Sequence, residues 1–188
     1  MSTVTLIDYG AGNLRSLRAA FERVGAAVEV AAGADNVDAA ERLVLPGVGA
    51  AAPAMAALRT RGLDAAIRRS QAPLLGVCLG MQLLFERSAE GNVECLGLLP
   101  GQVVAIDWAA RVPHMGWNDV AGEQGSAVCY FAHSFAVDCE PALVAGRTPI
   151  DDRQVPTVVR RGRLSGVQFH PEKSAADGRR MLEAWLAA

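Results

Sequence analysis

The first half of the chain alternates short apolar runs with stretches whose apolar residues recur at helical spacing. The apolar runs occupy 4–7, 28–30, 42–45 and 74–77. The helical patterns occupy 14–24, 53–61, 63–70 and 79 to about 87. The short runs predict strands, and strands joined through helices pair in parallel. The pattern therefore predicts an α/β fold with helices on both faces of a sheet.

The second half is richer in strand patterns. Strand candidates occupy 103–106, 127–131, 143–145, 157–160 and 164–169. The last two are separated by Arg-Gly-Arg at 161–163, which predicts a hairpin turn. Met181, Leu182 and Trp185 indicate a C-terminal helix. No repeat or linker interrupts the chain, so 1–188 is predicted to form one three-layer domain. Its largely parallel central sheet gains antiparallel strands in the C-terminal half.

Composition narrows the classes of function. The 188 residues are 51% hydrophobic and 20% charged, with a net charge of −2, as in a folded globular protein. There is no basic tract, so neither nucleic acid nor an anionic membrane is indicated as a partner. The longest uncharged stretch, 43–58, is too short and too broken by proline and glycine to span a bilayer.

The cysteine pattern also bears on compartment and cofactors. The four cysteines show no Cys-x-x-Cys spacing and no histidine cluster. A disulfide framework or zinc site is therefore not expected, and neither a metal nor a cofactor is predicted. A reducing cytoplasm is the simplest setting for such a chain.

The motif that carries the chemistry is Gly-Val-Cys-Leu-Gly at 76–80. A cysteine between glycines, after a strand and before a helical pattern, is typical of a nucleophile elbow with sulfur in place of the serine oxygen. A Cβ at either glycine would collide with a neighbouring element. A position at a helix N-terminus would favour the Cys78 thiolate. The alternative is a small core residue, as buried cysteines usually are, but core packing does not require the glycines.

A cysteine nucleophile needs a base, and the base needs an orienting group. Of His114, His133 and His170, only His170 has a carboxylate two residues away, Glu172, with a proline between them. Proline keeps the preceding residue extended, so the two side chains are predicted to share one side of an extended segment. The alternative is an ordinary ion pair at the end of a strand.

Two glycine-rich turns follow predicted strands. Pro-Gly-Val-Gly at 46–49 lies at the carboxyl end of a strand, where its backbone could supply an oxyanion hole beside the N–H of Leu79; alternatively it is only a tight turn. The second turn, at 10–12, begins like a dinucleotide fingerprint. Arg15 stands where the third glycine belongs, so this fingerprint fails.

Together these motifs resemble the class I, triad-type glutamine amidotransferases, and within them the glutaminase subunits of imidazole glycerol phosphate synthase. The matching stretches are 7–14, 46–49, 76–85, 113–118, 130–135 and 168–174. The elbow and the His-Pro-Glu segment are typical of the superfamily. The turn at 7–14 and Pro-His-Met-Gly-Trp-Asn at 113–118 are more specific to this subunit. The resemblance implies a flavodoxin-like, class I amidotransferase fold.

The resemblance also implies roles for individual residues. Cys78 would attack the carboxamide of glutamine, His170 would move the proton and Glu172 would orient His170. The oxyanion hole would comprise Val48, Gly49 and Leu79. Glutamine would be held by Gly49, Gln82, Ser134 and Phe135. Phe135 stands where a tyrosine is usual, which removes one hydroxyl contact. Ala51 stands where phenylalanine is common, and the segments 107–111 and 146–156 are short.

The implied partner is a (β/α)₈-barrel cyclase subunit, in a heterodimer, that receives the ammonia. Residues expected at or near that interface are Asn13, His114, Met115, Trp117, Tyr130 and Lys173. For His133 a structural role is predicted. Other hypotheses remain: a glutaminase serving an anthranilate, guanylate or pyridoxal phosphate synthase, a stand-alone cysteine hydrolase or isomerase, or a binding subunit without catalysis. The run at 113–118 favours imidazole glycerol phosphate synthase.

Overall fold

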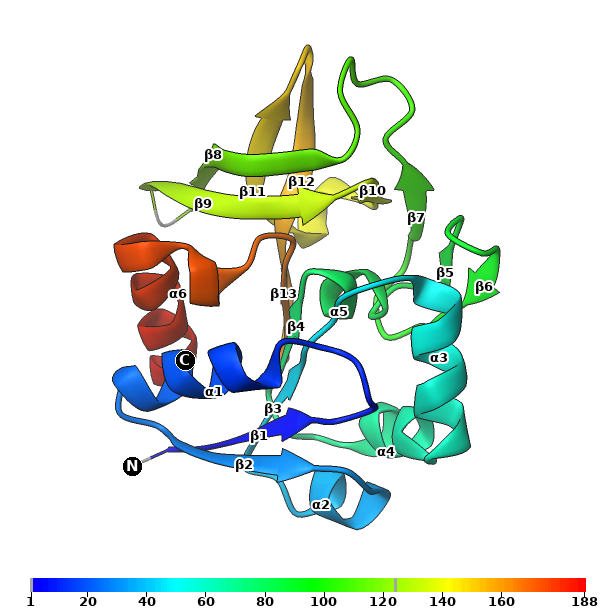
Figure 1. The fold of residues 1–188 in the computed structure, drawn as a ribbon, viewed down its shortest axis with the longest axis vertical. Coiled ribbons are helices and arrows are strands. Elements are labelled where there is room, and N and C mark those ends of the chain that lie inside the picture. Colours follow the sequence, from blue (N-terminus) through cyan, green and yellow to red (C-terminus); the bar gives the residue numbers. More distant parts are fainter. Residues whose placement is uncertain (1, 124) are drawn as a thin grey trace.

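The protein is built on one nine-stranded sheet and a smaller four-stranded sheet (Figure 1). The structure, a computed structural model, describes residues 2–123 and 125–188. The large sheet has the order β2-β1-β3-β4-β13-β12-β11-β8-β9, and the small sheet has the order β10-β7-β5-β6.

The elements follow one another along the chain with short connections. The strands of the large sheet are β1 (Thr3–Ile7), β2 (Ala27–Ala31), β3 (Arg42–Leu45), β4 (Leu74–Val77), β8 (His114–Gly122), β9 (Gly125–His133), β11 (Val144–Ile150), β12 (Arg153–Arg161) and β13 (Leu164–Val167). Those of the small sheet are β5 (Arg87–Ser88), β6 (Val93–Glu94), β7 (Gln102–Ala105) and β10 (Phe135–Asp138). The α-helices are α1 (Leu14–Arg23), α2 (Ala34–Asp38), α3 (Ala51–Thr60), α4 (Leu63–Arg69), α5 (Leu79–Gln82) and α6 (Ala175–Ala187). Two short 3₁₀ helices are η1 (Pro141–Leu143) and η2 (Pro171–Lys173).

The first half of the large sheet is parallel, as predicted. β1 pairs in parallel with β2 and β3, and β4 pairs in parallel with β3 and β13. In β3, Leu43 and Leu45 enter the core on one face while Val44 enters the core on the other, because successive strand side chains alternate. These strands are apolar on both faces because helices cover both.

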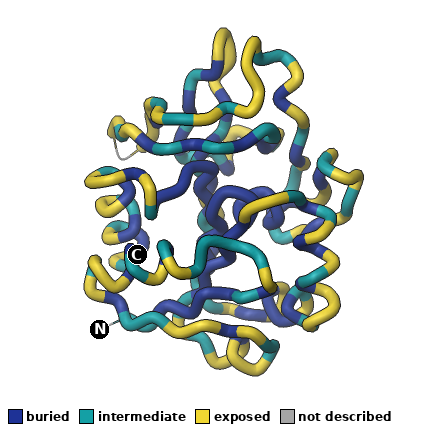
Figure 2. Tube along the Cα trace, in the orientation of Figure 1, coloured by how far each residue is buried: buried dark blue, intermediate teal, exposed yellow. Residues whose placement is uncertain are grey.

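Helices form the outer two layers, which confirms the predicted three-layer α/β architecture. On one face α1 and α6 bury Phe21, Leu182 and Trp185 in one core, and on the other α3 and α4 bury Met55 and Leu63 in a second. Buried residues concentrate in the central strands and exposed residues on the outer turns (Figure 2). Over the stretches 2–123 and 125–188, none of the helices is long and apolar enough to cross a membrane.

The C-terminal half extends the sheet with antiparallel strands, as predicted. β12 pairs antiparallel with β13 through the expected hairpin turn, and β11, β8 and β9 continue the sheet. β8 was not predicted because its large apolar side chains, Met115 and Trp117, lie on the exposed face, and only Val120 is buried. The short segment 146–156 contributes most of the β11–β12 hairpin.

The helix predicted from 79 to about 87 was wrong in its extent, since α5 ends at Gln82. The carbonyl oxygens of Leu83, Leu84 and Phe85 accept hydrogen bonds from the 96–99 segment. Those acceptors are consequently not available to a continuing helix, and the chain turns into β5 instead. The local pattern could not reveal this competition because 96–99 is a distant segment.

Candidate active site

Cys78 lies at a strained turn between β4 and α5. Its φ of 55° and ψ of −112° place a non-glycine residue at positive φ, a conformation that costs about 1–3 kcal/mol and is concentrated at functional sites. The Cys78 N–H donates to the Val167 carbonyl at 2.8 Å, which ties the turn to β13. This is the geometry of the predicted nucleophile elbow. Because α5 has only four residues, the turn itself rather than a long helix dipole defines the site.

The glycines around Cys78 allow backbone to touch backbone. A Cβ on Gly80 would lie 1.9 Å from the Leu45 carbonyl oxygen, and one on Gly76 would lie 2.6 Å from the Gly80 carbonyl oxygen. A Cβ on Gly47 would lie 2.4 Å from the Gly80 nitrogen. The predicted steric reason for these glycines is confirmed, and the 46–49 segment is thereby packed directly against the elbow.

The 46–49 segment is hydrogen-bonded to the core at Pro46 and is exposed to solvent at Val48. The hydroxyl of the buried Tyr9 donates to the Pro46 carbonyl at 2.9 Å, and burial followed by the charge of Cys78 raises the pKa of Tyr9. Gly49 has a φ of 88°, which suits glycine, while the neighbouring Val48 is 42% exposed. Leu79, as the first residue of α5, has an N–H without an intrahelical acceptor.

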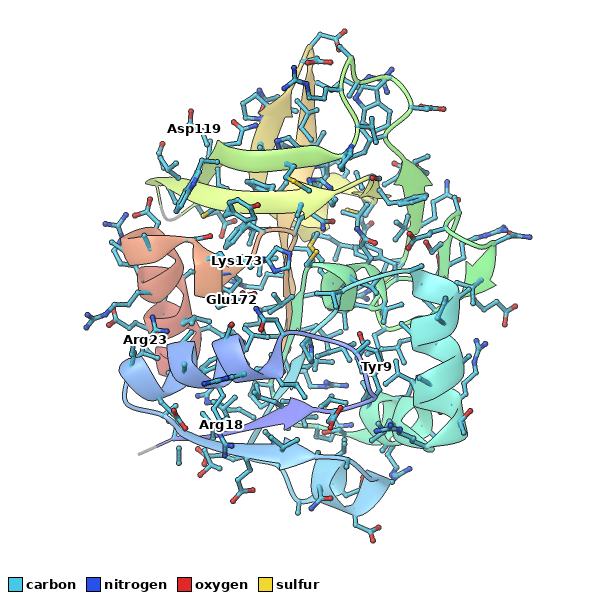
Figure 3. All side chains as sticks on the ribbon, viewed as in Figure 1. Tyr9, Arg18, Arg23, Asp119, Glu172 and Lys173 are labelled. Carbon is cyan, nitrogen blue, oxygen red and sulfur yellow. The ribbon has the colours of Figure 1, made fainter. Side chains whose placement is uncertain are left out.

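His170 and Glu172 form a buried pair. Nδ1 of His170 lies 3.0 Å from Oε1 of Glu172, and the Glu172 side chain is fully buried. His170 is extended, as predicted from the following proline. Glu172 lies in the 3₁₀ helix η2 rather than in an extended segment, so the turn, not strand alternation, brings the carboxylate back to the ring. The 3₁₀ helix η2 contacts both β9 and α1, and its residues Glu172 and Lys173 lie between these two elements (Figure 3).

Cys78 and Glu172 together set the pKa of His170. Burial alone would lower the pKa of His170, but hydrogen bonding and charge interactions with Cys78 and Glu172 raise it to about 9. The raised pKa makes His170 a stronger base, suited to take a proton from the Cys78 thiol. The carboxylate fixes Nδ1 as a donor, which leaves Nε2 for the thiol and the substrate.

A cavity of about 300 Å³ opens beside Cys78 and brings most of the predicted site residues together. Its lining includes Val48, Gly49, Cys78, Leu79, Gln82, Ser134, Phe135 and His170. Met115 and Lys173, predicted for the partner surface, also line it, together with Glu90, Pro113, Ala132 and His133. Glu172 is absent from the lining because it lies behind His170.

Two residues of the site were missed from the sequence. Gln168 is fully buried, with Nε2 3.7 Å from Cys78 Sγ and Oε1 2.9 Å from Gln82 Nε2. Its position two residues before His170 was a signal that could have found it. Glu90 accepts a hydrogen bond from the Ala51 N–H at 2.8 Å and supplies a carboxylate to the cavity. No local pattern distinguishes Glu90 from other surface acids.

His133 and His114 form a chain of hydrogen bonds beside the site. His133 Nδ1 lies 2.9 Å from the Phe135 carbonyl, so it must donate; His133 Nε2 then accepts from His114 Nδ1 at 2.9 Å. Asn118 donates in turn to His114 Nε2 at 3.1 Å. Burial lowers the pKa of His133 to about 4; the hydrogen bond to the Phe135 carbonyl opposes this shift, and the neighbouring His114 and His170 add to it. His133 is therefore neutral, in keeping with its predicted structural role.

The residues predicted for a partner surface fall into two groups. Met115 and Trp117 are 63% and 55% exposed, and Trp117 stacks edge-on against Tyr130 with ring centroids 6.0 Å apart. Lys173 Nζ lies 5.5 Å from the centroid of the same tyrosine ring. The ring of His114 instead turns to the opposite face of β8. Asn13 is half-buried at the start of α1, which contacts η2.

Size alone does not identify the site. A larger cavity of about 440 Å³ lies between α6 and the sheet, lined by Val120, Trp185 and others, and contains no member of the cysteine–histidine–glutamate set. Within residues 2–123 and 125–188, His, Cys, Asp and Glu side chains form no group of three that could hold a metal ion.

Comparison with known proteins agrees with this geometry. The model of the family "Glutamine amidotransferase class-I" matches residues 5–187. The chain belongs to this family. The amidotransferase is 48% identical to the imidazole glycerol phosphate synthase subunit HisH of Xanthomonas euvesicatoria, over 99% of this chain and 98% of that protein. It is 45% identical to the HisH subunit of Xylella fastidiosa, with the same coverage.

Solved structures with low sequence identity show the same fold. A crystal structure of a glutamine amidotransferase matches with a TM-score of 0.80 at 21% identity, over 98% of the amidotransferase and 99% of that chain. The structure of PurLQS from Thermotoga maritima matches with a TM-score of 0.75 at 21% identity, over 100% of the amidotransferase and 99% of that chain. The predicted class I amidotransferase fold is thus confirmed.

Proposed function

We propose that residues 1–188 form one glutaminase domain, the subunit of imidazole glycerol phosphate synthase that hydrolyses glutamine and passes ammonia to a cyclase subunit in histidine biosynthesis. The observation that carries the proposal is a strained Cys78 whose proton acceptor, His170, is held by the buried Glu172. Full-length identity to HisH subunits supports the choice of synthase.

The chemistry follows from the three side chains. The Cys78 sulfur attacks the carboxamide carbon of glutamine, with the thiol proton transferred to His170. The protonated His170 then donates a proton to the departing ammonia, and a γ-glutamyl thioester remains on Cys78. Water, deprotonated by His170, hydrolyses the thioester to glutamate and restores the thiol. Glu172 keeps Nδ1 protonated throughout, so Nε2 exchanges the proton in each step.

The cavity lining supplies the binding groups. The oxyanion of the tetrahedral intermediate would be stabilised by the N–H of Leu79 and by an N–H of the Val48–Gly49 segment, which packs against the elbow. Glutamine would be held by Gly49, Gln82, Ser134 and Phe135. Phe135 contributes no hydroxyl, so its contact is limited to its ring and backbone.

The cavity is continuous with the exposed surface that would bind the cyclase. Met115 and Lys173 line the cavity and also belong to this surface, which extends through Trp117 and Tyr130. An exposed methionine and tryptophan beside the cavity are typical of interface residues. Ammonia formed at Cys78 would therefore leave the cavity directly into the partner. Asn13 and the β8 backbone at His114 are proposed to contribute at the edge.

The same surface is connected to the catalytic base. The Tyr130 carbonyl accepts a hydrogen bond from the His170 N–H at 2.9 Å, and the Tyr130 N–H donates to Ser174 Oγ at 3.0 Å. A partner that shifts the Tyr130 backbone would therefore also shift His170 through this hydrogen bond. We expect the isolated chain to be a poor glutaminase, with a backbone change at 47–49 in the complex that completes the oxyanion hole.

The state of the four cysteine thiols supports a proposal for the cellular compartment of the protein. All four cysteines are free. Burial raises the pKa of both Cys95 and Cys129 to about 11, so neither is a reactive thiolate at neutral pH. Free thiols suit a reducing compartment, which supports a cytoplasmic location.

Glutaminase activity measured with and without the cyclase subunit and its ribotide ligand tests the proposal. We expect low activity alone and strong stimulation by that subunit, and loss of activity in Cys78→Ala. Mixing the chain with anthranilate, guanylate or pyridoxal phosphate synthase subunits tests the alternatives. Equal turnover of the isolated chain and the complex would refute gating by the partner, and stimulation by another synthase would reassign the pathway.

A further inference from the structure

We propose that Gln168 is a positioning residue that orients both the Cys78 thiol and the Gln82 carboxamide. The inference rests on the proposed roles of Cys78 and Gln82 and extends them to a side chain that does not line the cavity. Gln168 follows β13, and its own N–H donates to the Thr157 carbonyl at 2.9 Å. The residue before it, Val167, accepts the hydrogen bond of the Cys78 N–H, so Gln168 is anchored over the elbow.

The hydrogen-bond partners determine which way both amides point. Gln82 Nε2 lies 3.0 Å from the Phe135 carbonyl oxygen, which can only accept, so this atom of Gln82 is the amide nitrogen. The same nitrogen lies 2.9 Å from the Gln168 side chain, so the atom of Gln168 that faces it must be the carbonyl oxygen. The NH₂ group of Gln168 therefore faces Cys78, 3.7 Å from Sγ. Reversing either amide would bring two donors or two acceptors together.

This orientation has a chemical consequence for the thiol. A donor aimed at sulfur stabilises the anionic form relative to the neutral thiol, because the hydrogen bond to a charged acceptor is the stronger one. The donor also restrains the position of Sγ within the cavity. Gln168 and Gln82 are both buried, with 0% and 4% exposure, so water does not compete for these hydrogen bonds.

The orientation has a second consequence for glutamine. Both amide hydrogens of Gln82 are engaged, by Phe135 and by Gln168. The Gln82 carbonyl oxygen then remains as the acceptor on a side chain that lines the cavity. Loss of Gln168 would free the Gln82 amide to rotate, so substrate binding and thiol reactivity should change together.

The test is the rate of Cys78 alkylation by iodoacetamide as a function of pH, read by peptide mass spectrometry on the full-length chain alone and in complex with the cyclase subunit. Gln168→Leu removes both hydrogen bonds. We expect the pH midpoint of alkylation to rise by about one unit and the rate at pH 7 to fall about tenfold. Gln168→Glu keeps the shape but turns an acceptor toward sulfur, so its midpoint should rise further.

Thr157→Val is the matched control. It removes the buried 2.8 Å hydrogen bond between the hydroxyls of Thr157 and Thr148. These residues belong to the neighbouring strands β12 and β11, and neither lines the cavity. Its alkylation midpoint should match the wild type. In the stimulated complex, Gln168→Leu should also lower kcat and raise KM for glutamine, whereas Thr157→Val should change neither.

An unchanged alkylation midpoint in folded Gln168→Leu and Gln168→Glu would overturn the inference. If the leucine variant does not fold, the isosteric glutamate variant decides. Alkylation needs no turnover, so its outcome does not depend on the proposed function. Retention of glutaminase activity by Cys78→Ala would instead overturn the proposed function.

Discussion

The parallel and antiparallel halves of the large sheet contribute different parts of the candidate site. The parallel half, from β2 to β13, ends in the elbow at Cys78 and the 46–49 segment, where glycines allow backbone contacts that no side chain would fit. The antiparallel half, from β12 to β9, presents an exposed face with Met115 and Trp117. The site lies where the two halves meet, because His170 follows β13 and hydrogen-bonds to Tyr130 of β9.

The difference supports the proposal that reactivity and response to a partner depend on separate parts of the sheet. In the parallel half, close packing and strain fix the turn at Cys78, and substitutions there should reduce the chemical step or the stability. In the antiparallel half, an exposed surface joins the cavity, and substitutions there should reduce partner response while leaving the fold intact. Four predictions test this division.

The largest effect is expected at Cys78, the proposed nucleophile in the parallel half. Cys78→Ala should reduce glutaminase activity of the complex by at least about 10⁴-fold, because no thioester can form. Ammonia release from glutamine measures this. Cys139→Ala, a half-buried thiol outside the cavity lining, is the control and should retain activity. Affinity for the cyclase subunit should be unchanged in both variants.

Glu172→Gln should have the next largest effect, since it removes the carboxylate that orients His170. Activity should fall by about 10²–10⁴-fold, as when the orienting acid of a triad is neutralised. The pKa of His170, about 9 in the wild type, should also fall. Because that pKa is raised above its unfolded value, the interactions of His170 with Cys78 and Glu172 stabilise the protein fully below about pH 6.5, and this contribution is lost as the pH rises through 9.

Denaturant unfolding at pH 6 and pH 9.5 measures this linkage. The wild type should lose up to about 3 kcal/mol of unfolding free energy from His170 between these values, and Glu172→Gln should lose less. An equal loss in both proteins would show that Glu172 does not determine the protonation of His170.

Close packing at the elbow should appear as stability. Gly80→Ala places a methyl group 1.9 Å from the Leu45 carbonyl oxygen, and relief requires backbone movement. The unfolding free energy should fall by about 3 kcal/mol or more. Gly33→Ala is the matched control, because a Cβ on Gly33 would meet no atom within 4 Å and the φ of Gly33, −143°, suits any residue. Unchanged stability in Gly80→Ala would contradict the close packing described for the parallel half.

The smallest effect on the isolated chain is expected in the antiparallel half. Trp117→Ala should weaken binding of the cyclase subunit by about 2 kcal/mol, roughly 30-fold, as for an aromatic hot spot. Isothermal titration measures the affinity, and stability should change by less than about 1 kcal/mol. Val30→Ala alters a 41% exposed residue on the parallel edge strand β2 and should leave affinity unchanged. Equal affinities for both variants would place the partner surface elsewhere.

Sequence patterns predicted the fold best where local and global preferences agree. The strands at 42–45 and 74–77 were predicted at their observed bounds, because each is a short apolar run with a buried position on both faces. β8 was missed because Met115 and Trp117 face outward and only Val120 is buried, and the helix after Cys78 was overestimated because the carbonyl groups at 83–85 accept hydrogen bonds from 96–99. Neither cause is visible in a local window.

The candidate site divides in the same way. Cys78, His170 and Glu172 could be predicted from the glycines around the cysteine and the proline between the other two, because those residues restrict the backbone locally. Glu90 could not, since its importance comes from neighbours in space, and Gln168 was signalled only by its position two residues before His170. His114 was assigned to a surface by its motif, whereas the register of β8 and β9 places its ring against His133.

The sequence by itself determined the alternation of strands and helices, the tight turn at Cys78 and the chemistry of the reactive groups. These depend on residue type and short-range backbone restrictions. Tertiary structure alone decided that Tyr9 fastens the 46–49 segment, that Gln168 turns its NH₂ toward sulfur and that the cavity opens beside Met115 and Lys173. Such features arise from pairing and packing between distant segments, which no local pattern encodes.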